Sequence, residues 1–255
     1  MKRILLGLAI LILSTLMTNG VQAQGPKMVV GLGAAVAPDY EGSDDGEGVP
    51  LILFNAEWDN HMSVSIMGTS ARVNLLPHPF FRAGLAMEYI KKRDDVDNDA
   101  VDALPDVDTS FMAGGFFGFD YQGWNGSIEL MTDVADGNDG SIARLKGGYE
   151  MQINKAMKLN LGIFTTWADD DYMESYFSVS EAGSIVSGLD TYNADSGLKD
   201  VGLNVSVHYT PWQHWGIMGV LVYKRLLNDA EDSPVVDKEG NENQATFGIM
   251  ATYRF

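Results

Sequence analysis

Residues 245–255 read ATFGIMATYRF, and every second residue of this stretch is apolar or aromatic. The apolar set runs from Ala245 to Phe255, while Thr, Gly, Met and Arg occupy the positions between. Alternation with a period of two predicts a β-strand with one face in an apolar environment. A chain end normally frays. Because this one stays apolar up to Phe255, we predict that the last strand is paired and that its apolar face contacts lipid.

The same alternation recurs along most of the sequence after residue 26, for example at 201–209 and 215–223. The runs are about ten residues long, which is typical of strands that cross an outer membrane, whereas strands of soluble sandwiches are mostly shorter. Aromatic residues gather at the run ends, as in membrane barrels. They are Trp58, Tyr89, Tyr121, Trp124, Trp167, Tyr209, Trp215, Tyr223 and Tyr253. We therefore predict an all-β, transmembrane, antiparallel up-and-down β-barrel.

The opposite face of these runs is small or polar and carries single charges. A soluble core would not hold so many separate charges, so we interpret these positions as facing the barrel lumen. The candidate lumen charges are Arg82, Glu88, Arg144, Lys146, Glu150, Lys158, Lys224 and Arg254, with Arg72, Glu129 and Asp133 as further candidates. Pairing across the lumen would close it, and segregation by sign would form a selective pore. Both arrangements remain open at this point.

Residues 1–23 predict a secretory signal peptide, with Lys2 and Arg3 ahead of an apolar stretch and a small-residue cleavage site ending at Ala23. We expect cleavage there, which leaves residues 24–255 as the barrel. The sequence holds no Cys, so disulfides and thiol chemistry are excluded.

The strand count depends on a slip in the alternation between residues 61 and 75. The apolar positions are even before Gly68 and odd after Ser70. A bulge or a tight turn would explain the slip. Because both ends of such a barrel lie in the periplasm, the number of strands must be even. A turn gives twelve strands, which we favour, and the alternative of ten leaves the first run outside the barrel.

The links between runs alternate in length. Short links lie near 76–79, 121–123, 154–156 and 211–214, and long links lie at 93–108, 135–140, 169–197 and 228–243. Bacterial barrels have short periplasmic turns and long outer loops, which assigns the sides. The side of segment 38–48 stays open because of the strand count.

The formal net charge is -18, and 28 of the 35 acidic residues lie between the runs. We interpret these stretches as solvated loop surface. Runs such as DDVDND (94–99) lack the pattern of a calcium-binding EF-hand loop, so we expect no dedicated metal site and leave divalent binding undecided. The acidity argues against nucleic-acid binding, which needs clustered Lys and Arg.

An enzyme is not expected. Ser206 and His208 share the polar face of one run, but residues two apart on a strand stand about 7 Å apart, too far for a direct hydrogen bond. The sequence contains none of the common hydrolase, metalloprotease or phosphate-loop motifs. We predict no catalytic residue and no cofactor.

Four stretches carry a family resemblance: PDYEGSDD (38–45), YFSVSEAGSIVSGLDTY (176–192), RLLNDAEDSPVV (225–236) and the final YRF. In this order they resemble the MipA/OmpV family of outer-membrane proteins. The residues that match the family motifs are Pro38, Asp39, Tyr40, Glu41, Gly42, Ser43, Asp44, Tyr176, Phe177, Ser233 and Pro234. Tyr253 and Phe255 match the C-terminal signature of outer-membrane barrels. One departure is Ser178, where the family pattern usually has Gly.

The resemblance implies a location in the cell outer membrane and a non-catalytic scaffold linked to peptidoglycan synthesis. Implied partners are outer-membrane lipid and lipopolysaccharide, the barrel assembly machinery, a lytic transglycosylase and a penicillin-binding protein. A narrow channel for small solutes and a surface adhesion protein are the alternatives.

Overall fold

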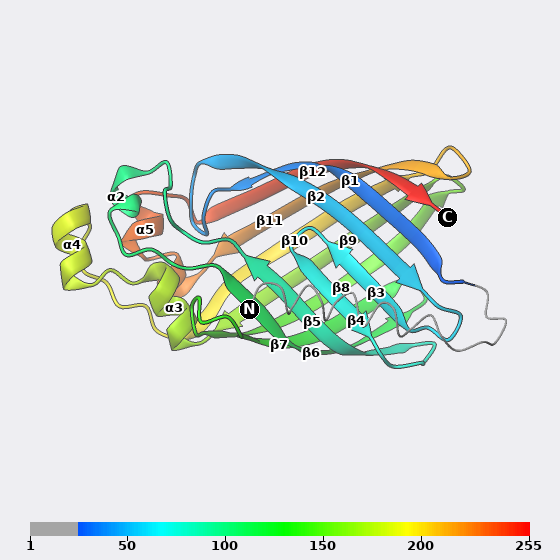
Figure 1. The fold of residues 1–255 in the computed structure, drawn as a ribbon, viewed down its shortest axis with the longest axis horizontal. Coiled ribbons are helices and arrows are strands. Elements are labelled where there is room, and N and C mark those ends of the chain that lie inside the picture. The colour runs from blue at the N-terminus through cyan, green and yellow to red at the C-terminus, as the bar shows by residue number, and fades with distance from the viewer. Residues whose placement is uncertain (1–24) are drawn as a thin grey trace.

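The computed structural model describes residues 25–255, so the predicted signal peptide lies outside the described part. These residues form a closed barrel of antiparallel strands in which β1 pairs with β12 (Figure 1). The strands are β1 (Lys27–Pro38), β2 (Gly46–Glu57), β3 (Ser63–Met67), β4 (Ser70–Asn74), β5 (Phe81–Ile90), β6 (Ser110–Tyr121), β7 (Trp124–Asp133), β8 (Ser141–Asn154), β9 (Met157–Ala168), β10 (Gly197–Tyr209), β11 (Trp215–Leu226) and β12 (Asn243–Arg254). The predicted all-β up-and-down barrel is confirmed.

The last strand is paired on both sides, with β1 and with β11. Its alternate residues Phe247 and Ile249 are 60% and 55% exposed on the outer face, whereas Met250 and Thr252 are buried inside. A strand held in a closed sheet has no free edge to fray. The predicted pairing of the sequence that ends at Phe255 is therefore confirmed.

The strand count follows from a tight turn at Gly68. Met67 pairs with Ser70 across this turn, and Gly68 has a φ of 55°, a conformation that glycine adopts without strain. The turn separates two strands of five residues each. β1 pairs with β2 over its full length. Among the described residues twelve strands therefore close the barrel, and the alternative of ten is wrong.

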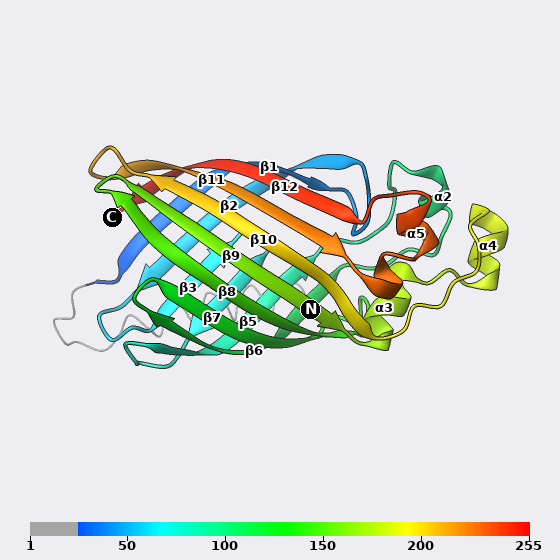
Figure 2. The same ribbon diagram turned by 180° about the vertical axis from the view of Figure 1, so that it is seen from behind.

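Apart from the tight turn at Gly68 between β3 and β4, the links gather by length at opposite ends of the barrel (Figures 1 and 2). We call the end with the long links the loop end and the other the turn end. The loop end carries α2 (Asp99–Asp102), α3 (Asp170–Phe177), α4 (Glu181–Ser187), η1 (Asn228–Ala230) and α5 (Pro234–Asp237). Segment 39–45 also lies at the loop end, because the Asn241 N–H donates to the Gly42 carbonyl at 2.8 Å. This settles the side that the sequence left open.

The helices begin at residues that cap them. Asp169 accepts a hydrogen bond from the backbone of Tyr172 at the start of α3, and Ser180 and Ser233 cap α4 and α5 in the same way. Such side chains satisfy backbone N–H groups that the first helical turn leaves unpaired. The long links are therefore ordered. Their helices are too short to show a helical period in the sequence. No helix of residues 25–255 is long and apolar enough to cross a membrane.

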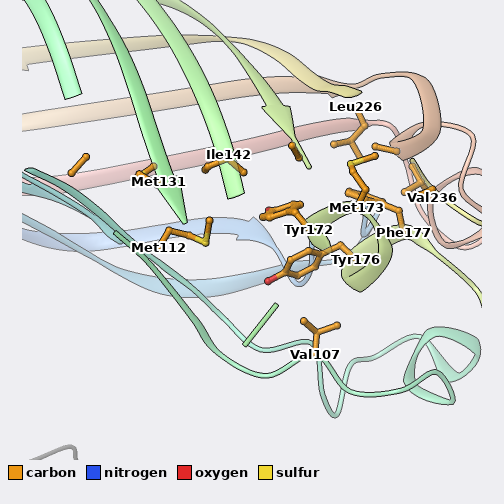
Figure 3. Close-up of a cluster of buried hydrophobic side chains, with 14 of the residues drawn as sticks. Val107, Met112, Met131, Ile142, Tyr172, Met173, Tyr176, Phe177, Leu226 and Val236 are labelled. Atoms are coloured by element: carbon orange, nitrogen blue, oxygen red, sulfur yellow. The ribbon is translucent and has the colours of Figure 1, made fainter. Parts of the chain in front are cut away.

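The described residues form three apolar clusters. One joins loop residues such as Tyr40, Val101 and Val235. The largest lies at the loop end, where side chains of α3 meet inner-face residues of the strands (Figure 3). Its members include Met112, Met131, Ile142, Tyr172, Met173, Tyr176, Phe177, Leu226 and Val236. The smallest one, around Ala35, Leu51 and Met250, lines the lumen at β1, β2 and β12.

Candidate functional site

A packed unit formed by segment 39–45, α3 and α5 lies at the loop end, and we call it the plug. Its apolar side is the largest cluster, in which Met173 and Phe177 are almost completely buried (Figure 3). Burying such side chains contributes about 1.5–3 kcal/mol each. The plug is therefore held by an apolar core that it shares with the barrel wall, and it is not a solvated loop surface.

Glu41 joins the plug to the barrel wall. Its Oε1 accepts hydrogen bonds from Lys199 at 2.5 Å and from Lys224, and its Oε2 accepts one from the Tyr172 hydroxyl at 2.9 Å. Burial by itself raises the pKa of Glu41, but the attraction of Lys199 and Lys224 outweighs it and holds the pKa well below its usual range. One carboxylate thus ties α3, β10 and β11 together.

Lys199 reaches Glu41 because β10 is irregular at this point. The register with β9 shifts between Leu198 and Asp200, so the side chains of Lys199 and Asp200 both lie inside and are 3% and 2% exposed. A bulge redirects a side chain that regular alternation would place outside. Lys199 also pairs with Asp200 at 2.7 Å. Alternation alone therefore could not predict that both side chains lie inside the barrel. The available signal was the adjacent Lys199 and Asp200, two opposite charges at the start of a strand run.

The residues of the first family motif all lie in or beside the plug. Tyr40 is buried, and burial raises the pKa of Tyr40 to about 12. Gly42 has a φ of 103°, and its N–H donates to the Gln244 side chain at 3.2 Å. Asp39, the first residue of the plug, pairs with Lys91 at 2.9 Å. The prediction of a solvated surface for this acidic stretch is wrong for Glu41, which is largely buried.

The other motif residues meet the first in the same place. The Ser233 hydroxyl donates to the Phe177 carbonyl at 2.6 Å, and Pro234 is buried at the first turn of α5. The Arg93 guanidinium donates to the Tyr176 carbonyl at 2.9 Å. Ser178 ends α3 at a φ of −82°, so this position does not need glycine here. Stretches far apart in sequence thus build one structure.

A belt of ion pairs crosses the lumen below the plug. Glu129 on β7 is 2% exposed and pairs with Arg72 of β4 and with Lys146 at 3.0 Å. Glu88 on β5 pairs with Arg144 of β8 at 2.6 Å. The Arg72–Glu129 and Glu88–Arg144 pairs join strands that are not neighbours in the sheet, so they span lumen space, whereas Lys146 lies on β8 next to β7. The charges are paired, and they are not separated by sign.

Of the remaining candidate charges, Asp133 lies at the loop end, and the others lie at or near the turn end. Arg82 pairs with Asp120 at 3.2 Å and Lys158 pairs with Glu150 at 2.8 Å. Arg254 lies at the same end, where its backbone N–H donates to the His214 carbonyl at 2.7 Å. A cavity of about 630 Å³, which we call the vestibule, is lined by Arg82, Asp120, Glu150 and the 121–124 turn, among others. It opens at the turn end.

The Ser206–His208 pair that the sequence brought to attention is not hydrogen-bonded in the described residues. His208 Nε2 lies 2.9 Å from Thr252 Oγ1, so its ring bonds to a threonine and not to Ser206. No three metal-ligand side chains of the described residues lie close enough together to hold an ion. Asp133 accepts backbone hydrogen bonds from its own loop, including one from Asn138 at 2.8 Å.

A closed antiparallel barrel with an apolar outer face, a charged lumen and one plugged end defines an outer-membrane β-barrel protein. The model of the family described as MltA-interacting protein MipA matches residues 30–255. The chain therefore belongs to this family, and its location is the outer membrane.

Relatives over nearly the whole chain agree with this family. The chain is 27% identical to the "MltA-interacting protein" of Escherichia coli (strain K12), covering 98% of each chain. It is 26% identical to the "Putative outer membrane protein YiaT" of the same organism, covering 91% of this chain and 93% of that one. Among solved structures, the NanC porin covers 89% of this chain and all of its own, with 12% identity and a TM-score of 0.47.

Proposed function

We propose that this protein is a non-catalytic scaffold of the outer membrane that binds a lytic transglycosylase at the turn end of its barrel. The observation that carries the proposal is the plug: the loop end is occupied by packed, ion-paired chain. A barrel that is filled in this way offers its surfaces for interaction and does not offer a wide passage. Its relative in Escherichia coli is named for interaction with MltA.

The orientation of the barrel in the membrane determines which end would contact the transglycosylase. Short turns of bacterial barrels face the periplasm, where peptidoglycan lies. The turn end presents exposed residues such as Lys155, Trp212 and Gln213. Each turn alone is too small for a stable interface, which buries about 800 Å² per partner. Binding therefore needs several turns together.

In-cell photocrosslinking tests the proposal. A photoreactive amino acid replaces Lys155 or Gln213 at the turn end, and Glu181 on α4 serves as the matched loop-end position, since all three are exposed. The expected result is an adduct with a lytic transglycosylase from the turn-end positions only, identified by mass spectrometry. Equal recovery from Glu181, or recovery of assembly factors alone, overturns the scaffold proposal.

A narrow channel is the second candidate, and the vestibule favours it. The cavity holds Arg72, Arg82 and Glu150 and opens toward the turn end. Passage would require the plug to move away from Lys199 and Lys224. Conductance in a planar bilayer that depends on substitutions at Arg82 and Glu150 would support the channel over the scaffold.

A further inference from the structure

The vestibule has the size of a ligand site. Its volume of about 630 Å³ lies within the 300–1,000 Å³ typical of pockets for small molecules. Its wall includes Arg72, whose guanidinium lies 5.4 Å from the centre of the Phe116 ring and pairs with buried Glu129.

The charges in the vestibule wall are already balanced. Arg72 pairs with Glu129, Arg82 with Asp120, and Glu150 with Lys158. An anionic ligand would have to displace a carboxylate, and a cationic ligand would have to displace a guanidinium or an ammonium group. Replacing one ion pair by another has a desolvation penalty that exceeds the electrostatic gain unless the geometry of the new pair is excellent. The wall therefore favours a ligand without net charge.

Amide and hydroxyl groups make up most of the remaining polar wall: Asn55, Ser65, Gln122, Asn125, Ser127 and Asn160. Within residues 25–255 their side chains make no hydrogen bond to protein by ordinary geometric criteria, unlike Asn74 or Asn138, which do. Each amide offers two donors and an acceptor. Such amides, placed on several strands around one cavity, can bind a ligand that both donates and accepts hydrogen bonds.

The barrel wall makes room for one of these amides. A Cβ at Gly148 would lie 2.9 Å from Asn125 Oδ1 and 2.9 Å from the Leu161 carbonyl oxygen. These separations are too short for a real side chain. The Asn125 amide therefore lies across the strand at Gly148, where a larger residue would push it from its place.

We propose that the vestibule is a binding site for a neutral oligosaccharide. Sugar hydroxyls donate and accept hydrogen bonds, carry no charge and match an amide wall whose ion pairs are satisfied. An apolar ligand would leave the amides without partners, at a cost for each. The site goes beyond the proposed scaffold function, since it concerns a ligand bound by the barrel alone.

Calorimetric titration of the purified full-length barrel tests the site. The barrel is kept in an amine-oxide detergent, because detergents with sugar headgroups would compete. The probes are tri-N-acetylchitotriose and maltotriose as neutral trisaccharides and trigalacturonate as an anionic one. The expected result is saturable binding of at least one neutral probe with a Kd of about 1 mM or tighter, and weaker binding of trigalacturonate.

Matched variants locate the binding. The pair Asn125→Ala with Asn160→Ala is expected to weaken binding at least tenfold. If the double variant fails to fold, Asn160→Asp takes its place. This substitution keeps the side-chain shape and removes both donors, so it is also expected to weaken binding. Asn193→Ala at the loop end, where the Asn193 side chain donates to Asp195, is expected to change nothing.

Three results would overturn the site. They are the absence of saturable binding of both neutral probes up to about 10 mM, tighter binding of trigalacturonate, and unchanged binding by the folded vestibule variants. The assay contains no partner protein, so these outcomes leave the scaffold proposal standing, and failure of the crosslinking leaves the oligosaccharide site standing.

Discussion

Replacing Glu41 by Gln is expected to loosen the plug without unfolding the barrel. The Glu41 side chain is 11% exposed, and it accepts from Lys199, Lys224 and Tyr172. Breaking a buried ion pair by removing one partner costs about 3–5 kcal/mol. Lys199 keeps Asp200 and Lys224 is partly exposed, so the lower limit of about 3 kcal/mol applies.

A loss of about 3 kcal/mol raises the population of the open plug about 100-fold. Hydrogen exchange with mass spectrometry measures this change directly in peptides that cover α3. The expected result is that α3 amides exchange about 100-fold faster in the E41Q barrel, while β10 and β11 remain protected. Thermal unfolding of the barrel serves as a check that the fold is intact.

Glu150→Gln is the matched control, because Glu150 also pairs with a lysine, at 2.8 Å, but both side chains are about half exposed. An exposed pair contributes about 0–1 kcal/mol. Exchange of α3 should therefore match the wild type. Exchange in the E41Q variant within twofold of the wild type, or equal to that of E150Q, would refute the role assigned to Glu41.

Three further predictions follow from the same contacts. Gly42→Ala is expected to destabilise the plug by about 1–3 kcal/mol, because φ is 103° and a Cβ would lie 2.7 Å from Val236; Gly197→Ala, at an open position, is the control, and α5 exchange is the measurement. Glu129→Gln is expected to lower barrel stability by about 3–5 kcal/mol in denaturant titrations, since Arg72 and Lys146 lose their partner; an effect as small as that of Glu150→Gln would contradict this. The pKa of Glu41 is lowered on folding, so its stabilising effect is complete above its unfolded pKa and is lost only as pH falls through the lower folded pKa; protection of α3, corrected for intrinsic exchange, should therefore be equal at pH 7 and at about pH 5.

The barrel was predictable because its determinants are local. A strand that faces lipid on one side repeats with a period of two, and the slip between Ile66 and Ala71 marks the turn at Gly68. The lengths of the links likewise follow from the chain alone. These features need no knowledge of which distant residues meet.

The plug was not predictable in the same way. Glu41 is 158 residues from Lys199 and 183 from Lys224, and acidic stretches look alike whether they are solvated or buried with a partner. The bulge that turns Lys199 and Asp200 inward also breaks the alternation on which strand assignment depends. The pairing of Arg72 with Glu129 was left open because a strand pattern gives the face of a residue and not its height in the lumen.

The measurement that tests the central claim most directly is the conductance of the purified wild-type barrel in a planar bilayer, compared with the E41Q variant. A barrel closed by its plug predicts no stable open level for the wild type and frequent openings for E41Q. A steady conductance of the wild type, unchanged by Glu41→Gln, would contradict the conclusion that the plug closes the barrel.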